Sequence, residues 1–172
     1  MTIEPDTKDW TWVLTRPCPE CGFDPAGVAV EDLAGLITAN ARGWVPALDG
    51  PDAAVRPAAN VWSPLEYACH VRDVHRIFGE RLTLMLEQDD PQFANWDQDV
   101  TAVESRYDEQ DPATVSRELV EAAGQVAAIY AAVEGDQWER PGRRSNGSVF
   151  TVATLGVYHL HDVEHHLHDI AR

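Results

Sequence analysis

Apolar residues recur at helical spacing in four stretches of the chain, and each stretch is bounded by residues that favour a helix start or stop. The first stretch begins near Asp24 or Val30 and keeps this spacing as far as Trp44. Because proline removes a backbone donor, we expect Pro46 to end or kink this helix.

The second stretch has the clearest start. Ser63 can accept a hydrogen bond from the free backbone amides, Pro64 suits the first helical position, and Glu66 stands where a capping box places a carboxylate. The pattern predicts a helix that runs from this point to about Gln88.

The third and fourth stretches have similar signals. Asp111 precedes a proline and an amphipathic segment that we expect to stop near Gly135, where glycine suits a left-handed cap. The fourth helix is predicted from about Thr151 to Ala171.

Two-residue alternation is absent over any useful length, although residues 147–154 have a short extended pattern. Four long helices without a sheet predict an all-α four-helix bundle. Two long connecting loops, residues 89–111 and 135–150, are the places where we expect functional side chains. The length predicts a single domain over residues 1–172, with residues 1–23 as an N-terminal extension that contains CPEC.

The net charge and the hydropathy of the chain limit the classes of partner that it can bind. A formal net charge of −16 repels phosphate backbones, so nucleic-acid binding is not expected. No apolar run is long enough for a membrane helix, and the first ten residues lack the features of a signal peptide. We therefore expect a cytoplasmic protein that acts on a small molecule and does not bind membranes. Six tryptophans are many for one small core, so a contact between two copies in a homodimer is a further possibility.

Three cysteines leave several interpretations open. Cys18 and Cys21 form a C-x-x-C motif, and Cys69 stands alone. The paired thiols are either without a special role, or a reversible disulfide or redox pair, or half of a metal site completed by histidines or by another chain. An odd number of cysteines does not suggest a secreted disulfide scaffold.

Five of the seven histidines lie in the last 16 residues, VYHLHDVEHHLHDIAR. His161 and His165 are four residues apart, which places them about 40° apart around a helix. His168 returns to nearly the same side, so these three residues form a histidine row. Two imidazoles one turn apart can hold one metal ion if another element supplies a third ligand.

His70, in the first turns of the second helix, is the natural third ligand. His75 lies five residues further on, and we expect it at the surface, together with His159 and His166, which point away from the histidine row. Two other interpretations remain open: His70 is a hydrogen-bonded core residue, and the row is a pH-sensitive helix face.

Several further residues are candidates for contact with the metal ligands. Glu66 and Asp73 lie about one turn before and after His70, and Asp162 and His168 lie beside or within the histidine row. Ligating imidazoles often donate their other N–H to a carboxylate, which suits Glu66 and Asp162. A capping role for Glu66 fits equally well, and no catalytic acid or base is assigned.

Two motifs together resemble the DinB-like superfamily, which includes YfiT-like proteins and the mycothiol- and bacillithiol-dependent transferases. They are W-S-P-L-E-x-x-x-H from Trp62 to His70, and H-x-x-x-H from His161 to His165. The resemblance implies an up-up-down-down four-helix bundle with a divalent metal ion, zinc or nickel, held by His70, His161 and His165. It also implies a low-molecular-weight thiol as co-substrate, whose pKa the metal lowers.

The leading hypothesis is a metal-dependent transferase that joins such a thiol to a small electrophile. Hydrolysis is the second enzymatic alternative, and a non-enzymatic metal-binding or stress-related protein is the third. A fourth protein ligand would favour the non-enzymatic protein over the two enzymes, because catalytic metal sites keep an open position. Arg143 and Arg144 are candidates for binding a substrate carboxylate, although a solvated basic loop is the simpler interpretation.

Overall fold

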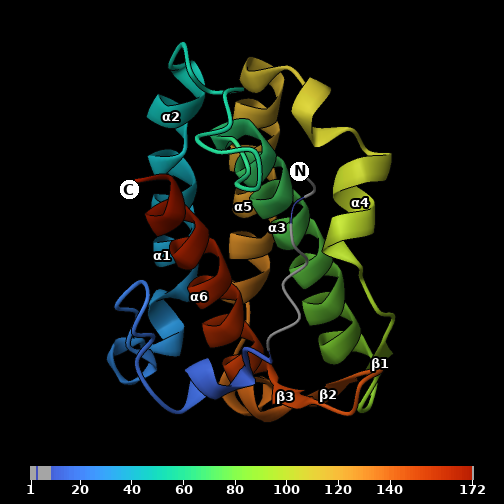
Figure 1. The fold of residues 1–172 in the computed structure, drawn as a ribbon. Helices are drawn as coiled ribbons and strands as arrows, with labels where there is room; N and C mark the ends of the chain where they lie inside the picture. The colour runs from blue at the N-terminus through green and yellow to red at the C-terminus, as the bar shows by residue number, and fades with distance from the viewer. Residues whose placement is uncertain (1–2, 4–8, 172) are drawn as a thin grey trace.

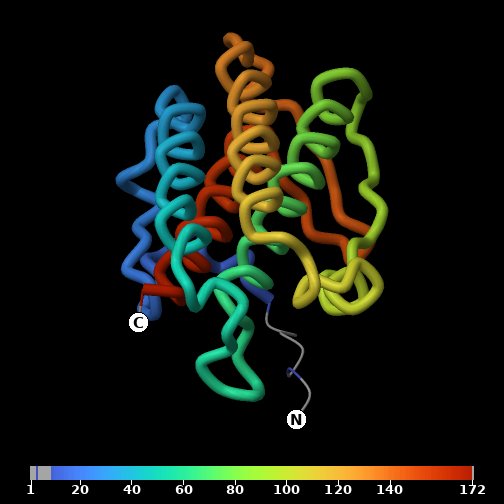
Figure 2. The backbone as a smooth tube through the Cα atoms, turned by 90° about the horizontal axis from the view of Figure 1, so that it is seen from above, coloured from blue at the N-terminus to red at the C-terminus, as the bar shows by residue number. Residues whose placement is uncertain are grey.

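The computed structural model describes residue 3 and residues 9–171, and its four long helices form a bundle (Figures 1 and 2). The long helices are α1 (Leu33–Gly43), α3 (Pro64–Glu87), α5 (Pro112–Ala131) and α6 (Val152–Ile170). Their buried apolar side chains share one hydrophobic core. The predicted all-α four-helix bundle is therefore confirmed.

Within the described residues, shorter elements precede α1 or connect the long helices. They are two short α-helices, α2 (Val45–Asp49) and α4 (Gln98–Glu104), three strands, β1 (Gln92–Phe93), β2 (Pro141–Arg144) and β3 (Val149–Thr151), and five 3₁₀ turns, η1 (Thr11–Leu14), η2 (Pro25–Gly27), η3 (Val30–Asp32), η4 (Tyr107–Glu109) and η5 (Gly135–Glu139). The first predicted helix is thus divided into 3₁₀ turns, α1 and α2, and Pro46 lies in the first turn of α2.

The helix directions are up-down-down-up along the chain, rather than the up-up-down-down order that the family resemblance implies. α1 and α6 run parallel, because Leu33 packs on Gly156 near their beginnings and Gly43 lies against Leu167 near their ends. α3 and α5 both lead into the small sheet, from which α6 starts back (Figure 1).

Local capping explains where the long helices begin. The hydroxyl of Ser63 accepts a hydrogen bond from the amide of Glu66, whose carboxylate accepts one from the Ser63 amide, so the predicted capping box is present. Asp111 and Thr151 cap α5 and α6 through their side chains. α5 ends at Ala131, before the predicted stop.

A three-stranded sheet joins the two long connections, and the sequence patterns missed it. β1 pairs with β2 in parallel, Gln92 opposite Arg143, and β2 pairs with β3 in antiparallel fashion, Gly142 opposite Phe150. Strands of two to four residues are too short to show alternation. A Cβ atom on Gly142 would lie 2.6 Å from the ring of Phe93, so glycine permits the close approach there.

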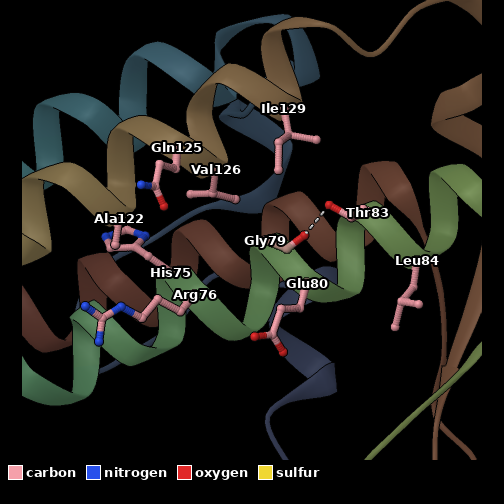
Figure 3. Close-up of a pocket in the computed structure, with 10 residues that line it drawn as sticks. All are labelled: His75, Arg76, Gly79, Glu80, Thr83, Leu84, Ala122, Gln125, Val126 and Ile129. Carbon is pink, nitrogen blue, oxygen red and sulfur yellow. Dashed lines mark hydrogen bonds between the residues drawn. The ribbon is translucent and has the colours of Figure 1, made fainter.

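An open hollow of about 500 Å³ lies between α3 and α5 (Figure 3). Its lining includes Gly79, Thr83 and Val126, and the Thr83 hydroxyl donates to the Gly79 carbonyl at 2.9 Å. No cluster of metal-binding atoms lies in its lining within the described chain. Across residues 9–171, no helix has the length and apolar character of a membrane span.

Replacing Gly156 with alanine tests the contact between α1 and α6. The added Cβ would collide with Leu33 and lie 3.1 Å from the Tyr130 ring, so we expect the free energy of unfolding to fall by about 1–3 kcal/mol. Gly124→Ala is the matched control, because nothing lies within 4 Å of its Cβ position in α5 and alanine there should stabilise by about 0.5–1 kcal/mol. Urea denaturation measures both, and equal effects would contradict the close packing.

Candidate metal centre

His70, Asp162 and His166 form a cluster between α3 and α6, with ligand atoms that all lie within 4.8 Å of one another. Nε2 of His70 and Nε2 of His166 are each 3.7 Å from Oδ1 of Asp162. Ligands placed tetrahedrally about 2.1 Å from an ion are separated by about 3.4 Å. The spacing of these three donors is therefore close to that of a coordinated metal.

The buried polar atoms of this cluster lack hydrogen-bond partners. Both ring nitrogens of His70 and Oδ1 of Asp162 are in this state, and His70 is fully buried. Burial lowers the pKa of His70, which favours the neutral imidazole that binds metals. Burial alone would raise the pKa of Asp162, but His70 and His166 beside it lower that pKa and favour the carboxylate. A divalent cation would satisfy all these atoms, so the residues fit a metal ion.

Aromatic rings fix the positions of the two histidines. The Trp96 ring stacks on His70 with centroids 5.5 Å apart and planes 7° apart, and Trp62 lies 5.6 Å from the same imidazole. The ring of Tyr67 lies 5.3 Å from His166. These contacts leave the imidazoles little freedom to rotate.

A cavity of about 590 Å³ opens beside the cluster, with both polar and aromatic side chains in its wall. Asp162 and His166 line it directly. Trp62, Tyr67, Trp96 and Tyr158 are among its other lining residues. An ion bound by the three donors would therefore have positions open toward a space large enough for a small molecule.

Two arginines also line the cavity. Arg81 is buried, packs its guanidinium against the rings of Phe78 and Phe93, and has no carboxylate at ion-pair distance within the described chain. Burial, and then the charge of Arg144, lower the pKa of Arg81 to about 10. Arg143, the neighbour of Arg144 on β2, instead pairs with Asp90. The cavity wall therefore contains two guanidinium groups that suit an anionic group of a ligand, although five carboxylates also line it, those of Glu20, Asp97, Asp99, Asp162 and Asp169.

The structure divides the three predicted metal ligands between two clusters. His70 lies with Asp162 and His166, whereas His161 and His165 lie with Cys18 and Cys21. The assignment of one ion to His70, His161 and His165 together stays a prediction. The two histidines on α6 do share the cavity wall with Asp162 and His166.

The other predicted site residues have structural partners. The carboxylate of Glu66 caps α3 and accepts a hydrogen bond from Nε of Arg56 at 2.8 Å. Asp73 accepts hydrogen bonds from Arg72 and, at 2.6 Å, from the hydroxyl of Tyr107. His168 is half-buried and belongs to neither metal-binding cluster. Among the candidates, Asp162 alone lies beside the metal-binding atoms of His70.

Two histidines that we expect at the surface are fully buried, which corrects the sequence interpretation. Nδ1 of His75 and Nε2 of His159 are 3.0 Å apart, and burial lowers the pKa of His75 to about 4. The third cysteine, Cys69, is also a core residue, and its burial raises the pKa of the thiol to about 12. His166, the third residue expected to be exposed, belongs to the cluster with His70.

The sequence contains a signal for Asp162 and His166 as a pair of ligands. The two residues are separated by four positions, as His161 and His165 are, and so they also share one helix face. Carboxylate and imidazole together are a common ligand set for catalytic zinc. The spacing was visible, but the side of the helix that faces His70 was not.

Comparisons with known proteins agree with the fold. Residues 36–170 match the family model of the DinB superfamily. The solved structure of YfiT from Bacillus subtilis is similar with a TM-score of 0.74 and 17% identity, over 85% of this chain and 89% of that chain. That protein is described as a probable metal-dependent hydrolase with an unusual four-helix bundle topology. A search of curated proteins finds no match.

Replacing Glu66 with glutamine tests its role in capping. Burial alone would raise the pKa of Glu66, but hydrogen bonds from Arg56 and Ser63 outweigh burial and lower it. A lowered folded pKa means that ionised Glu66 stabilises the protein above pH about 4.5 and that this stability is lost as pH falls through the folded value.

We expect Glu66→Gln to reduce the free energy of unfolding by about 1–2 kcal/mol at pH 7, with a smaller difference at acidic pH. Unfolding curves between pH 3 and 7 measure this difference, and exposed Glu87→Gln is the control. A difference that does not change with pH would argue against the charged capping interaction.

Proposed function

The chain belongs to the DinB superfamily, and we propose that it is a divalent-metal-dependent enzyme that activates a nucleophile beside a small anionic substrate. A single observation carries this proposal. The metal-binding atoms of His70 and Asp162 are buried without hydrogen-bond partners, and they lie at the edge of a cavity. His70, Asp162 and His166 would hold the ion. When bound, the ion would supply a Lewis acid that makes a nucleophile available at neutral pH.

The protein side chains would position the reactants. Trp96 and Tyr67 hold the ligand imidazoles through ring contacts. Arg81 and Arg144 would bind the negative group of the substrate, because charge-assisted hydrogen bonds are strong in a partly desolvated cavity. Apolar parts of the substrate would lie against the indole rings of Trp62 and Trp96, which exclude water.

Two nucleophiles are candidates for the proposed reaction, a thiol and water. The sequence motifs resemble those of thiol-dependent transferases, so the leading candidate is a low-molecular-weight thiol of the mycothiol or bacillithiol kind that attacks a small electrophile. The likeness to a protein described as a probable metal-dependent hydrolase favours water as the second candidate. A volume of about 590 Å³ could hold both a thiol and its electrophile.

The number of protein ligands favours a catalytic metal ion over a stored one. Within the described chain the cluster with His70 contains three donor residues, and the cavity adjoins two of them. Catalytic sites keep a position open for substrate, whereas structural sites are closed by protein ligands. Zinc and nickel both suit two imidazoles and a carboxylate, and elemental analysis of the purified protein would identify the native ion.

Metal content tests the ligands. We expect His70→Ala and Asp162→Ala each to lose one transition-metal ion per chain relative to wild type, because each removes one of only three donors. His168→Ala is the control on the same helix and should retain the full content. Elemental analysis after reconstitution with zinc or nickel measures these values.

The alternative assignment gives a different result. If His70, His161 and His165 bind a single ion, the double variant His70→Ala/His161→Ala would lose no more metal than either single variant. If wild type binds no metal after reconstitution with either ion, the proposed enzyme function fails.

Activity distinguishes the two nucleophiles. Metal-loaded protein is assayed with a panel of anionic electrophiles and esters, with and without a low-molecular-weight thiol. Thiol-dependent consumption supports the transferase, and thiol-independent cleavage supports the hydrolase. Neither reaction, under conditions where an active member of the superfamily turns over, would contradict both.

In whichever reaction occurs, Arg144→Met should raise KM about 10- to 100-fold, because it removes a charged hydrogen bond to the substrate. Arg143→Met is the matched control, since Arg143 is paired with Asp90 and does not line the cavity.

A further inference from the structure

A second group of metal-binding side chains lies where the N-terminal segment meets α6. It consists of Cys18, Cys21, His161 and His165, and one ligand atom from each lies within 4.8 Å of those of the other three. Sγ of Cys18 is 3.7 Å from Nδ1 of His165. All cysteines of the described chain are free thiols, so no disulfide joins Cys18 to Cys21.

A tight backbone turn brings the two thiols together. The amide of Gly22 donates to the carbonyl of Cys18 at 2.9 Å, and the amide of Cys18 donates to the carbonyl of Phe23 at 2.8 Å. Gly22 has φ of +79°, a left-handed conformation that favours glycine. The turn therefore places both sulfur atoms where they can reach one ion.

The two histidines have ring nitrogens suited to coordination. Nε2 of His161 is buried and has no hydrogen-bond partner. His165 directs Nδ1 toward Cys18, while its Nε2 faces the carboxylates of Glu20 and Asp169 at 3.7 and 3.8 Å. Metal-bound imidazoles commonly direct the other nitrogen toward a carboxylate in this way.

We propose that Cys18, Cys21, His161 and His165 bind one Zn²⁺ in a closed, structural site. The spacings C-x₂-C and H-x₃-H are both those of structural zinc sites, and four protein ligands complete a tetrahedron. Two thiolates neutralise the charge of the ion. A neutral site suits this environment, because Cys18, His161 and His165 are only 1%, 4% and 8% exposed.

The surroundings do not suit a redox pair. Reactive C-x-x-C motifs contain a thiol of lowered pKa. Here burial first, and then the neighbouring Cys18 thiol, raise the pKa of Cys21 to about 11. The rings of Trp10 and Phe23 pack within 5.5 Å of the His161 ring and cover this side of the cluster.

The zinc site has ligands of its own and does not depend on the proposed enzyme centre, although His161 and His165 also line the cavity. Cys18 and Cys21 precede the residues that match the superfamily, so the site would be an addition to the shared bundle. It would link Cys18 to His165, which are 147 positions apart, and fasten the N-terminal segment to α6. Ion binding would then stabilise the folded chain, because the four ligands are brought together only by folding.

Cobalt substitution tests the proposal on the intact protein. Co²⁺ bound by thiolates has an intense sulfur-to-cobalt charge-transfer absorption, whereas Co²⁺ bound by imidazole and carboxylate alone has none. We expect this absorption in Co²⁺-loaded wild type and its displacement by one equivalent of Zn²⁺. Cys18→Ser and Cys21→Ser should each weaken it by half or more, because one thiolate remains, and the double variant should lose it and bind one zinc ion fewer than wild type. Cys69→Ser is the matched control and should keep both, since Cys69 lies outside the cluster.

The results separate this site from the enzyme centre. His70→Ala should keep the charge-transfer absorption, even though it removes a ligand of the other cluster. Because the main measurement uses wild type, a variant that fails to fold does not decide the outcome. Absence of the absorption in Co²⁺-loaded wild type would overturn the proposal. The proposal would also fail if a thiol reagent modified Cys18 and Cys21 equally fast with and without Zn²⁺.

Discussion

Consecutive residues of an α-helix point about 100° apart, and this rotation divides the histidine-rich turn of α6 between two sides of the helix. Asp162 and His166 lie beside His70 of α3, whereas His161 and His165 lie beside the cysteines of the N-terminal segment. Each pair keeps the four-residue spacing that lets two side chains share one ion. Both candidate metal centres therefore depend on how α6 is turned within the bundle.

Much of the fold was predictable because its signals are local. The starts of α3, α5 and α6 followed from Ser63, Asp111 and Thr151, whose caps involve residues only three positions away. The orientation of α6 is not local. It is set by contacts with α1, where Leu33 packs on Gly156 and the side-chain amide of Asn40 donates to the backbone carbonyl of Val163.

For the same reason the candidate site was predicted only in part. His70 and the last helix were identified, but the choice between the pairs 161/165 and 162/166 required the orientation of α6. The burial of His75 and His159 against each other also arises from packing between distant segments. The C-x-x-C motif could be read as half of a metal site, but its completion by His161 and His165 is a contact across most of the chain.

The small sheet has a mechanical consequence for the cavity. Trp96 follows β1 and Arg144 ends β2, and the parallel pairing of these strands connects the two segments by backbone hydrogen bonds. The indole that stacks on His70 thus lies three residues beyond the strand that pairs with the one carrying Arg144, although almost 50 residues separate Trp96 from Arg144 along the chain. The pairing of β1 with β2 therefore fixes where both segments enter the cavity wall, so a substitution that disrupts this short ladder would displace the indole and the guanidinium together.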